Sequence, residues 1–172
     1  MTTKEFLNNV SNSKQDVIQV FLDLLQEHDV GYCVIGGLAV NAYVEPVISL
    51  DLDMIVAAAS IEKLAKAAET LFTVKRFEHS LNLSSQASDL RIQLQTDPRY
   101  QDFIHKAAPM KVLGYDMRVA VLEDVLQGKI WAYSDEQRRL SKRQKDLADI
   151  LRIIESFPDL RNLLPDSIKA LL

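Results

Sequence analysis

The segment from residue 49 to residue 57 constrains the chain more than any other, because it places two acidic residues within an apolar run. Its apolar positions Leu50, Leu52, Met54 and Val56 alternate with Asp51, Asp53 and Ile55. A period of two is the pattern of a β-strand, so Asp51 and Asp53 are expected on one face. Neighbouring carboxylates repel each other unless a cation or solvent separates them. The segment therefore predicts either a divalent-cation site or a solvated strand face.

A pair of glycines precedes this strand. Residues 31–35 form a short apolar run, typical of a buried strand, and Gly36 and Gly37 follow it directly. Glycines at the end of a strand let the backbone turn sharply and approach a ligand, and free amide groups at such a turn attract phosphate. The same glycines also fit a plain tight turn, so this feature alone leaves both readings open.

The remaining pattern predicts an α/β (α+β) protein, with helices packed on a mixed β-sheet and further helices at the C-terminal end. Helices are expected at 14–28, 38–43, 61–71, after Asp97-Pro98, and at 122–133 and 141–157, with Asn12 or Ser13 capping the first and Ser60 the third. Further strands are expected at 72–77, 90–95 and 117–121. A chain of 172 residues is long enough for one domain over 1–172, with its core at about 14–157.

Composition excludes several classes of protein. Cys33 is the only cysteine, so an internal disulfide or a cysteine-based zinc site is excluded, and its apolar neighbours favour a role in the core. The net charge of −4 argues against broad attraction to nucleic acid but leaves a local basic patch open at 138–145. No apolar run approaches the length of a membrane span or a signal peptide, so we expect a cytoplasmic protein that does not enter the membrane.

The glycine pair and the aspartate pair together resemble a known signature. Residues 34–56, VIGGLAVNAYVEPVISLDLDMIV, are similar to the nucleotidyltransferase superfamily pattern, in which a Gly-Gly or Gly-Ser turn precedes a D-x-D or D-x-E pair. Residues 88–100, 128–132 (GKIWA) and 142–150 (KRQKDLADI) resemble the branch that includes AbiEii-type abortive-infection toxins. The resemblance covers about 31–155, most of the chain.

This resemblance implies an enzyme that moves a nucleoside monophosphate from an NTP to a hydroxyl group of RNA, protein or a small molecule. Asp51 and Asp53 would hold Mg²⁺ or Mn²⁺, and Gly36 and Gly37 would cradle the triphosphate. The resemblance further implies that Lys145 and Asp146 border the nucleotide site. It also implies a toxin of a toxin–antitoxin or phage-defence pair, with an antitoxin as its partner.

Lys129 and the helix of residues 141–157 allow two interpretations each. Lys129 lies three and four residues after Leu126 and Val125, which puts its stem on the inward stripe of its helix. Its amine then either reaches water along the surface or meets a phosphate or an acidic residue of the site. On the later helix, the charged residues fit a solvated face with short-range ion pairs: Lys142, Lys145, Asp146, Asp149 and Arg152. The resemblance implies instead that Lys145 and Asp146 border the nucleotide site.

Two departures from the family pattern support an alternative function. Catalytic members place a third carboxylate on a neighbouring strand, whereas the strand at 90–95 offers Arg91, Gln93 and Gln95. Asp89 lies two residues before Arg91, so it would point to the same face, and it is the candidate substitute. Where many relatives carry an arginine and a threonine before the acidic pair, this chain has Val47-Ile48-Ser49. The alternative is a catalytically degenerate module that binds a nucleotide or a partner.

Overall fold

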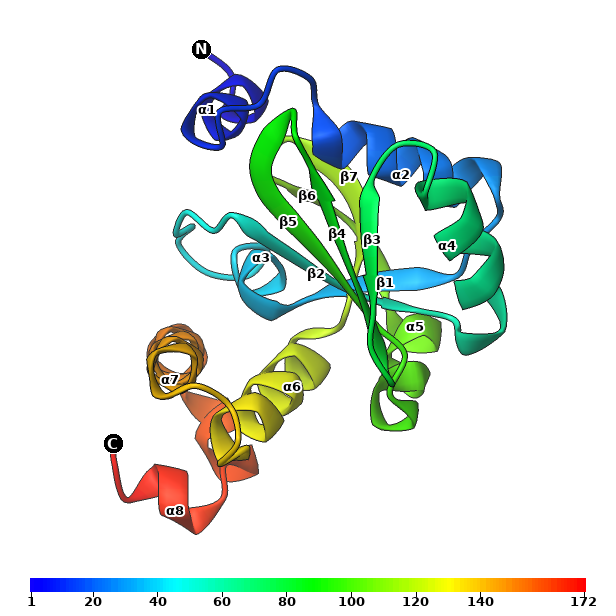
Figure 1. Ribbon diagram of the computed structural model, residues 1–172. Coiled ribbons are helices and arrows are strands. Elements are labelled where there is room, and N and C mark those ends of the chain that lie inside the picture. The colour runs from blue at the N-terminus through cyan, green and yellow to red at the C-terminus, as the bar shows by residue number, and fades with distance from the viewer.

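A computed structural model describes residues 1–172, and its centre is a seven-stranded mixed sheet (Figure 1). The strands lie in the order β3-β4-β5-β2-β1-β7-β6. Their bounds are β1 Tyr32–Ile35, β2 Asp51–Val56, β3 Thr73–Arg76, β4 Ser80–Ser85, β5 Ser88–Gln95, β6 Ala108–Val112 and β7 Tyr115–Val119. The pairs β1–β7 and β2–β5 are parallel and the other four pairs are antiparallel. The predicted mixed sheet is therefore confirmed.

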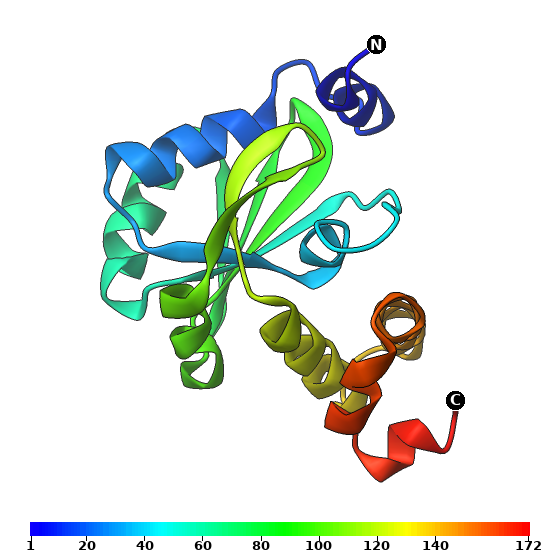
Figure 2. The same cartoon turned by 180° about the vertical axis from the view of Figure 1, so that it is seen from behind.

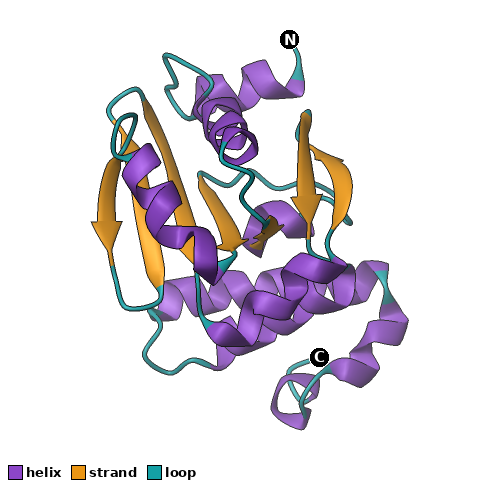
Figure 3. Cartoon of the chain, turned by 90° about the vertical axis from the view of Figure 1, so that its right-hand side faces the viewer, coloured by secondary structure: helices purple, strands orange, loops and turns teal.

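Helices surround the sheet (Figures 1 and 2). The α-helices are α1 Thr3–Val10, α2 Val17–Glu27, α3 Gly36–Val40, α4 Ile61–Ala68, α5 Gln101–Lys106, α6 Leu122–Ser134, α7 Leu140–Ser156 and α8 Asp166–Lys169. Short 3-10 helices lie at Ala58–Ser60, Pro98–Tyr100 and Pro158–Leu163. In Figures 1 and 3, α2 lies on the opposite side of the molecule from the paired helices α6 and α7. None of the helices combines the length and the apolar composition that a membrane span requires.

Alternation along the strands divides the sheet into an apolar and a polar side. In β2, Leu52 and Met54 are fully buried, whereas Asp51 and Asp53 are only partly covered. In β5, the buried Ile92 and Leu94 alternate with exposed polar residues in the same way. These apolar side chains belong to one buried cluster that also includes residues of α2 and α4. Burial of this face at roughly 25 cal/mol per Å² holds the sheet in place and leaves the aspartates on the other face.

The expected elements are confirmed with shifted ends, and four strands or α-helices were not predicted. These are α1, β4, β6 and α8. β6 includes Pro109, a residue that strands tolerate mainly at sheet edges, and β6 is an edge strand. The prediction that Asn12 or Ser13 caps the first long helix is wrong, because Asp16 accepts a hydrogen bond from the Gln19 amide. The predicted Ser60 cap makes no side-chain hydrogen bond.

Candidate active site

Asp51 and Asp53 lie on the polar face of β2, beside the glycine bend. β2 pairs with β1 so that Asp53 is opposite Ile35, the residue that immediately precedes Gly36. The strand pairing therefore brings the acidic pair to the end of β1, where the chain turns into α3. The proximity of the glycine pair and the aspartate pair, which the sequence pattern predicts, is present in the structure.

Gly36 packs directly against the Asp53 carboxylate. Its φ is +69°, a left-handed value that side chains rarely adopt. A Cβ atom built on Gly36 would lie 3.0 Å from Asp53 Cβ and would overlap Asp53 Oδ2. By contrast, Gly37 is helical, and a Cβ there would meet nothing closer than Ser49 Oγ at 3.8 Å. Gly36 thus allows the close approach of bend and carboxylate, while Gly37 borders open space.

The two carboxylates differ in how the protein neutralises them. Asp51 accepts a 3.0 Å hydrogen bond from Lys142 Nζ and lies 2.9 Å from Arg91 Nε. The Asp53 carboxylate has no hydrogen bond or ion pair within the chain. One carboxylate is therefore paired twice, and the other is unpaired within the chain.

Their pKa values move in opposite directions. Burial alone would raise the pKa of Asp51, but the hydrogen bond and charge of Lys142, with the charge of Arg91, hold it below its ordinary value. Burial raises the pKa of Asp53, and the nearby Asp51 charge adds to this rise, while the charge of Lys129 opposes it. An ionised Asp53 is thus costly in the ligand-free protein, and a cation would relieve that cost.

A network of ion pairs joins α6 to α7 beside these carboxylates. Lys129 of α6 is 8% exposed, and its Nζ lies 3.0 Å from Asp146 Oδ1 and 2.7 Å from Asp149 Oδ2. Arg138 Nε lies 2.7 Å from the other oxygen of Asp146, and Arg152 Nη1 lies 2.7 Å from Asp149 Oδ1. Burial alone would lower the pKa of Lys129, but the two aspartates hold it above its ordinary value. The lysine amine meets acidic residues and does not reach water along the surface.

The segment between α3 and β2 forms one wall of the cavity that Asp51 and Asp53 face. Asn41 donates from Nδ2 to the Val47 carbonyl at 2.7 Å and accepts from the Val47 amide at 3.0 Å. Arg152 of α7 donates to Asn41 Oδ1 at 3.2 Å and to the carbonyl of Glu45. These contacts hold Val47 and Ile48, each 55% exposed, at the rim.

Together these elements enclose a cavity of about 270 Å³, which we call the glycine-side cavity. Its lining includes Gly37, Asp51, Asp53 and Ser49 from the sheet side. The helical side contributes Lys129, Arg138, Lys142, Lys145, Asp146, Asp149 and Arg152. Five basic side chains therefore face four acidic ones, a charge balance that suits a polyphosphate accompanied by a cation.

The donor set fits a single hard cation. Mg²⁺ commonly takes one or two protein carboxylates and completes its shell with water and substrate phosphates. Asp51 and Asp53 supply two carboxylates on one face, and the Asp53 oxygens have no protein partner. No group of three or more His, Cys, Asp or Glu residues is arranged to hold a metal. The residues therefore fit an ion shared with a triphosphate better than an ion held by protein ligands alone.

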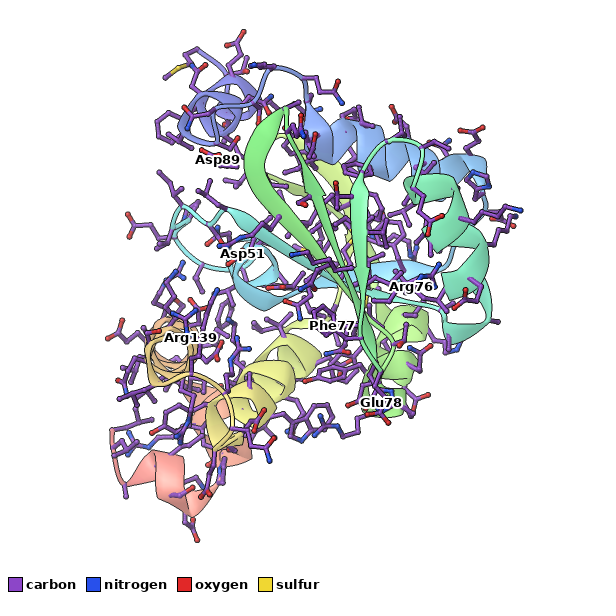
Figure 4. All side chains as sticks on the ribbon, viewed as in Figure 1. Asp51, Arg76, Phe77, Glu78, Asp89 and Arg139 are labelled. Atoms are coloured by element: carbon purple, nitrogen blue, oxygen red, sulfur yellow. The ribbon has the colours of Figure 1, made fainter.

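The structure brings most of the predicted site residues together and leaves one apart. Asp51, Asp53, Gly37, Lys129, Lys145 and Asp146 line the glycine-side cavity, and Gly36 contacts Asp53. Asp89 does not line it: Asp89 Oδ2 accepts from Asn12 Nδ2 at 2.5 Å, near α1 and away from Asp51 (Figure 4). In the parallel register of β2 and β5, Gln93 lies opposite Asp53 and Arg91 lies opposite Asp51.

Sequence reasoning did not assign three basic residues of this site: Arg138, Lys142 and Arg152. Arg138, from the segment between α6 and α7, was considered only as part of a surface basic run, and Lys142 and Arg152 were considered only as part of a helix face. Lys142 reaches Asp51 across 91 positions of the sequence, a separation over which periodicity carries no information. For Arg138 and Lys142, the basic run at 138–145 was the only available signal.

Comparisons with known proteins agree with this architecture. No family model matches the sequence, and no curated protein matches it. Among solved structures, the antibiotic-resistance factor ANT(2″)-Ia in complex with adenylyl-2″-tobramycin is similar, with a TM-score of 0.64 and 16% identity over 90% of this chain and 95% of that chain. The lincosamide antibiotic adenylyltransferase LnuA, bound to lincomycin, has a TM-score of 0.57 and 12% identity over 83% of this chain and 99% of that chain.

A third solved structure is also similar. An antigenic nucleotidyltransferase-like protein from Paracoccidioides brasiliensis has a TM-score of 0.54 and 17% identity, over 90% of this chain and 78% of that chain. These likenesses confirm the predicted nucleotidyltransferase fold, and at such identities they show the fold alone. The AbiEii-like branch stays a prediction from the sequence.

Replacing each glycine of the bend by alanine should separate their roles. Gly36→Ala forces a side chain into a left-handed conformation and into Asp53, so it should lower the free energy of unfolding by at least about 2 kcal/mol. Gly37→Ala occupies a helical position with ordinary contacts and should leave it unchanged or raise it by up to about 1 kcal/mol. Urea denaturation measures both, and equal effects would contradict the assigned contact with Asp53.

Substitutions at the two aspartates should have opposite effects on the metal-free protein. A carboxyl with a raised pKa in the folded state destabilises that state once it ionises, so Asp53→Asn should stabilise the protein at neutral pH. This gain should shrink as pH falls towards about 4, where the carboxyl becomes protonated in the unfolded chain too. Asp51 has a lowered pKa, so its ionised form stabilises the fold and Asp51→Asn should destabilise it at neutral pH. Thermal melts across pH, with EDTA present, test both signs.

The buried ion pairs of Lys129 should matter far more than an exposed pair of the same length. Lys129→Met removes one partner from the buried Asp146 and one from the half-buried Asp149, and it should cost about 3–5 kcal/mol of stability. Lys111 Nζ lies 2.8 Å from Asp116 Oδ1, but both side chains are exposed, so Lys111→Met should change stability little. Denaturation of the two variants under identical conditions measures the difference; similar losses would mean that Lys129 is not buried as described.

Proposed function

We propose that this protein is a Mg²⁺- or Mn²⁺-dependent nucleotidyltransferase that transfers a nucleoside monophosphate from an NTP to a hydroxyl acceptor. The observation that carries the proposal is the asymmetry of the acidic pair: Asp51 is neutralised by the protein, while the half-buried Asp53 is packed on Gly36 and its carboxylate has no partner in the chain. Partial burial of a carboxylate without a partner is costly, and a bound cation would offset that cost. The nucleotidyltransferase fold of the similar structures supports the same reading.

The glycine-side cavity would receive the NTP. Gly37 carries no side chain and lines the cavity, so phosphate oxygens can approach the backbone there. Lys142 and Lys145 border the same space and would neutralise the charge that develops on the leaving pyrophosphate. The exposed side chains of Val47 and Ile48 at the rim offer an apolar surface for the sugar or base.

Asp146 would act by positioning basic side chains of the cavity. Both Asp146 oxygens are taken, one by Lys129 and one by Arg138. Asp146 therefore positions these cations and need not touch the nucleotide. A bound divalent ion would neutralise the phosphates and favour loss of the acceptor's hydroxyl proton. The chain's part is to hold that ion with Asp51 and Asp53 and to keep Lys142 and Lys145 beside the phosphates.

A second candidate function follows from the neighbouring strand. The register places Gln93 beside Asp53 and Arg91 beside Asp51, so a third carboxylate is missing from the adjacent positions of β5. Neither side chain is a proton acceptor at neutral pH, and neither binds Mg²⁺ strongly. This observation favours a module that binds a nucleotide with a cation but turns it over slowly or not at all. The toxin role and the antitoxin partner stay predictions from the resemblance.

Two measurements on the same variants decide between these functions. Calorimetry with a non-hydrolysable NTP and Mg²⁺ should show binding by the native protein and a loss of about 100-fold in affinity for Asp53→Asn. Transfer of label from radioactive NTPs to cell extract should fall by a similar factor. Asp116→Asn, an exposed acid on β7, is the control and should change neither.

The outcomes separate the alternatives. Binding without transfer would establish the non-catalytic module, and neither binding nor transfer would overturn the proposal. Asp89→Asn tests the third-carboxylate hypothesis directly: because Asp89 contacts Asn12 and not the cavity, we expect transfer to persist.

A further inference from the structure

A second cavity lies on the other side of the acidic pair. Its volume is about 290 Å³, and it shares Asp51, Asp53, Arg138 and Lys142 with the glycine-side cavity. The 3.0 Å contact between Lys142 Nζ and Asp51 Oδ2 therefore stands at the boundary of both spaces. We call the second space the sheet-side cavity, because β3, β4 and β5 supply the rest of its lining.

Strand pairing arranges the floor of this cavity in rows that end at the carboxylates. In one row, Lys75 of β3 is opposite Asn82 of β4, Asn82 is opposite Gln93 of β5, and Gln93 is opposite Asp53 of β2. Residues paired in this way point to the same face of a sheet. The row therefore forms a continuous polar track from the edge strand to the acidic pair, and Figure 1 shows its four strands side by side.

A parallel row runs beside the first. Ser84 of β4 is opposite Arg91 of β5, and Arg91 is opposite Asp51 of β2. Arg91 leans towards Asp51, with its Nε 2.9 Å from Asp51 Oδ1, while its side chain remains 66% exposed. Both rows thus present hydroxyl, amide and basic groups to the cavity.

The charges of the sheet-side cavity select its ligand. Lys75, Arg91, Arg138 and Lys142 face it, and the only acidic residues there are the cation-binding pair Asp51 and Asp53. Lys75 makes no ion pair within the chain, so its charge is free for a ligand. A divalent ion on the acidic pair would leave this space strongly positive. Such a space attracts anions and repels a polycation such as an aminoglycoside.

We propose that the sheet-side cavity binds the acceptor, and that this acceptor carries phosphate next to the hydroxyl that is modified. The inference rests on the proposed function, which places the NTP in the glycine-side cavity, so that acceptor and leaving pyrophosphate lie on opposite sides of the reacting phosphorus. In the reaction, the acceptor hydroxyl oxygen forms a bond to the α-phosphorus, the bond to the bridging oxygen breaks, and pyrophosphate leaves with that electron pair. The hydroxyl proton passes to solvent. Lys75 and Asn82 would hold the acceptor's phosphate.

The test measures acceptor binding without any NTP, so it stands apart from transfer. Fluorescence anisotropy of a short labelled RNA with a free 3′-hydroxyl, in Mg²⁺, should show binding that Lys75→Glu weakens about tenfold. The same variant should lower the slope of log affinity against log salt by about 0.7, the value for one phosphate contact on a single strand. Asn82→Asp adds a negative charge without changing size and should weaken binding in the same direction.

Lys66→Glu is the matched control, because it makes the same change in net charge on an exposed position of α4, which packs on the apolar side of the sheet. It should leave RNA affinity unchanged. Displacement of the RNA by a sugar phosphate would identify a small phosphorylated acceptor, and failure to displace would identify a nucleic-acid strand; either supports an anionic acceptor.

Three results would overturn the inference: no RNA binding by the native protein, equal weakening by Lys75→Glu and Lys66→Glu, or tighter binding of tobramycin than of RNA. None of them bears on Mg²⁺-dependent NTP binding by calorimetry. Conversely, RNA binding that depends on Lys75, in a protein that binds no NTP, would refute the proposed function and leave an anion-binding track on the sheet.

Discussion

The unequal treatment of two adjacent carboxylates is the constraint on which this structure depends. Alternation in β2 forces Asp51 and Asp53 onto one face, where their charges repel. Lys142 and Arg91 form ion pairs with Asp51 and neutralise its charge. Asp53 has no such ion pair, and its carboxylate packs closely against Gly36. The nearby charge of Lys129 offsets only part of the cost of burying that carboxylate, because the pKa of Asp53 is still raised.

The helices α6 and α7 complete this arrangement through charge as well as through apolar packing. Lys129 links them by contacting Asp146 and Asp149, and Arg152 extends the network to the segment that precedes β2. Buried ion pairs contribute little net stability, but each requires its partner, so the relative positions of the helices are closely defined. The cavity wall at Val47 is consequently positioned by residues more than a hundred positions later in the chain.

The sequence predicted those parts of the molecule that local pattern determines. Period-two alternation placed Asp51 and Asp53 on one face, and the glycine pair indicated a bend beside them; both features are present. β4 was not predicted because only Leu81 and Leu83 show the apolar alternation of a strand, and serines follow them at its end. The sequence left two alternatives for the Lys129 amine, which were water or an anionic group. The spacing of residues within one helix cannot show which partner another helix supplies. The contact of Lys142 with Asp51 was not predictable, because it depends on how α7 packs against the sheet.

The position of Lys142 has a consequence for the order of events at the site. Its ammonium group already provides part of the positive charge that a divalent ion would bring to Asp51. An ion that binds alone must therefore compete with Lys142 for the Asp51 carboxylate. A triphosphate changes this competition, since it offers the lysine another anion and offers the ion further oxygen ligands. In the proposed reaction, the metal and the nucleotide would therefore enter as one complex, and free Mg²⁺ by itself would have low occupancy.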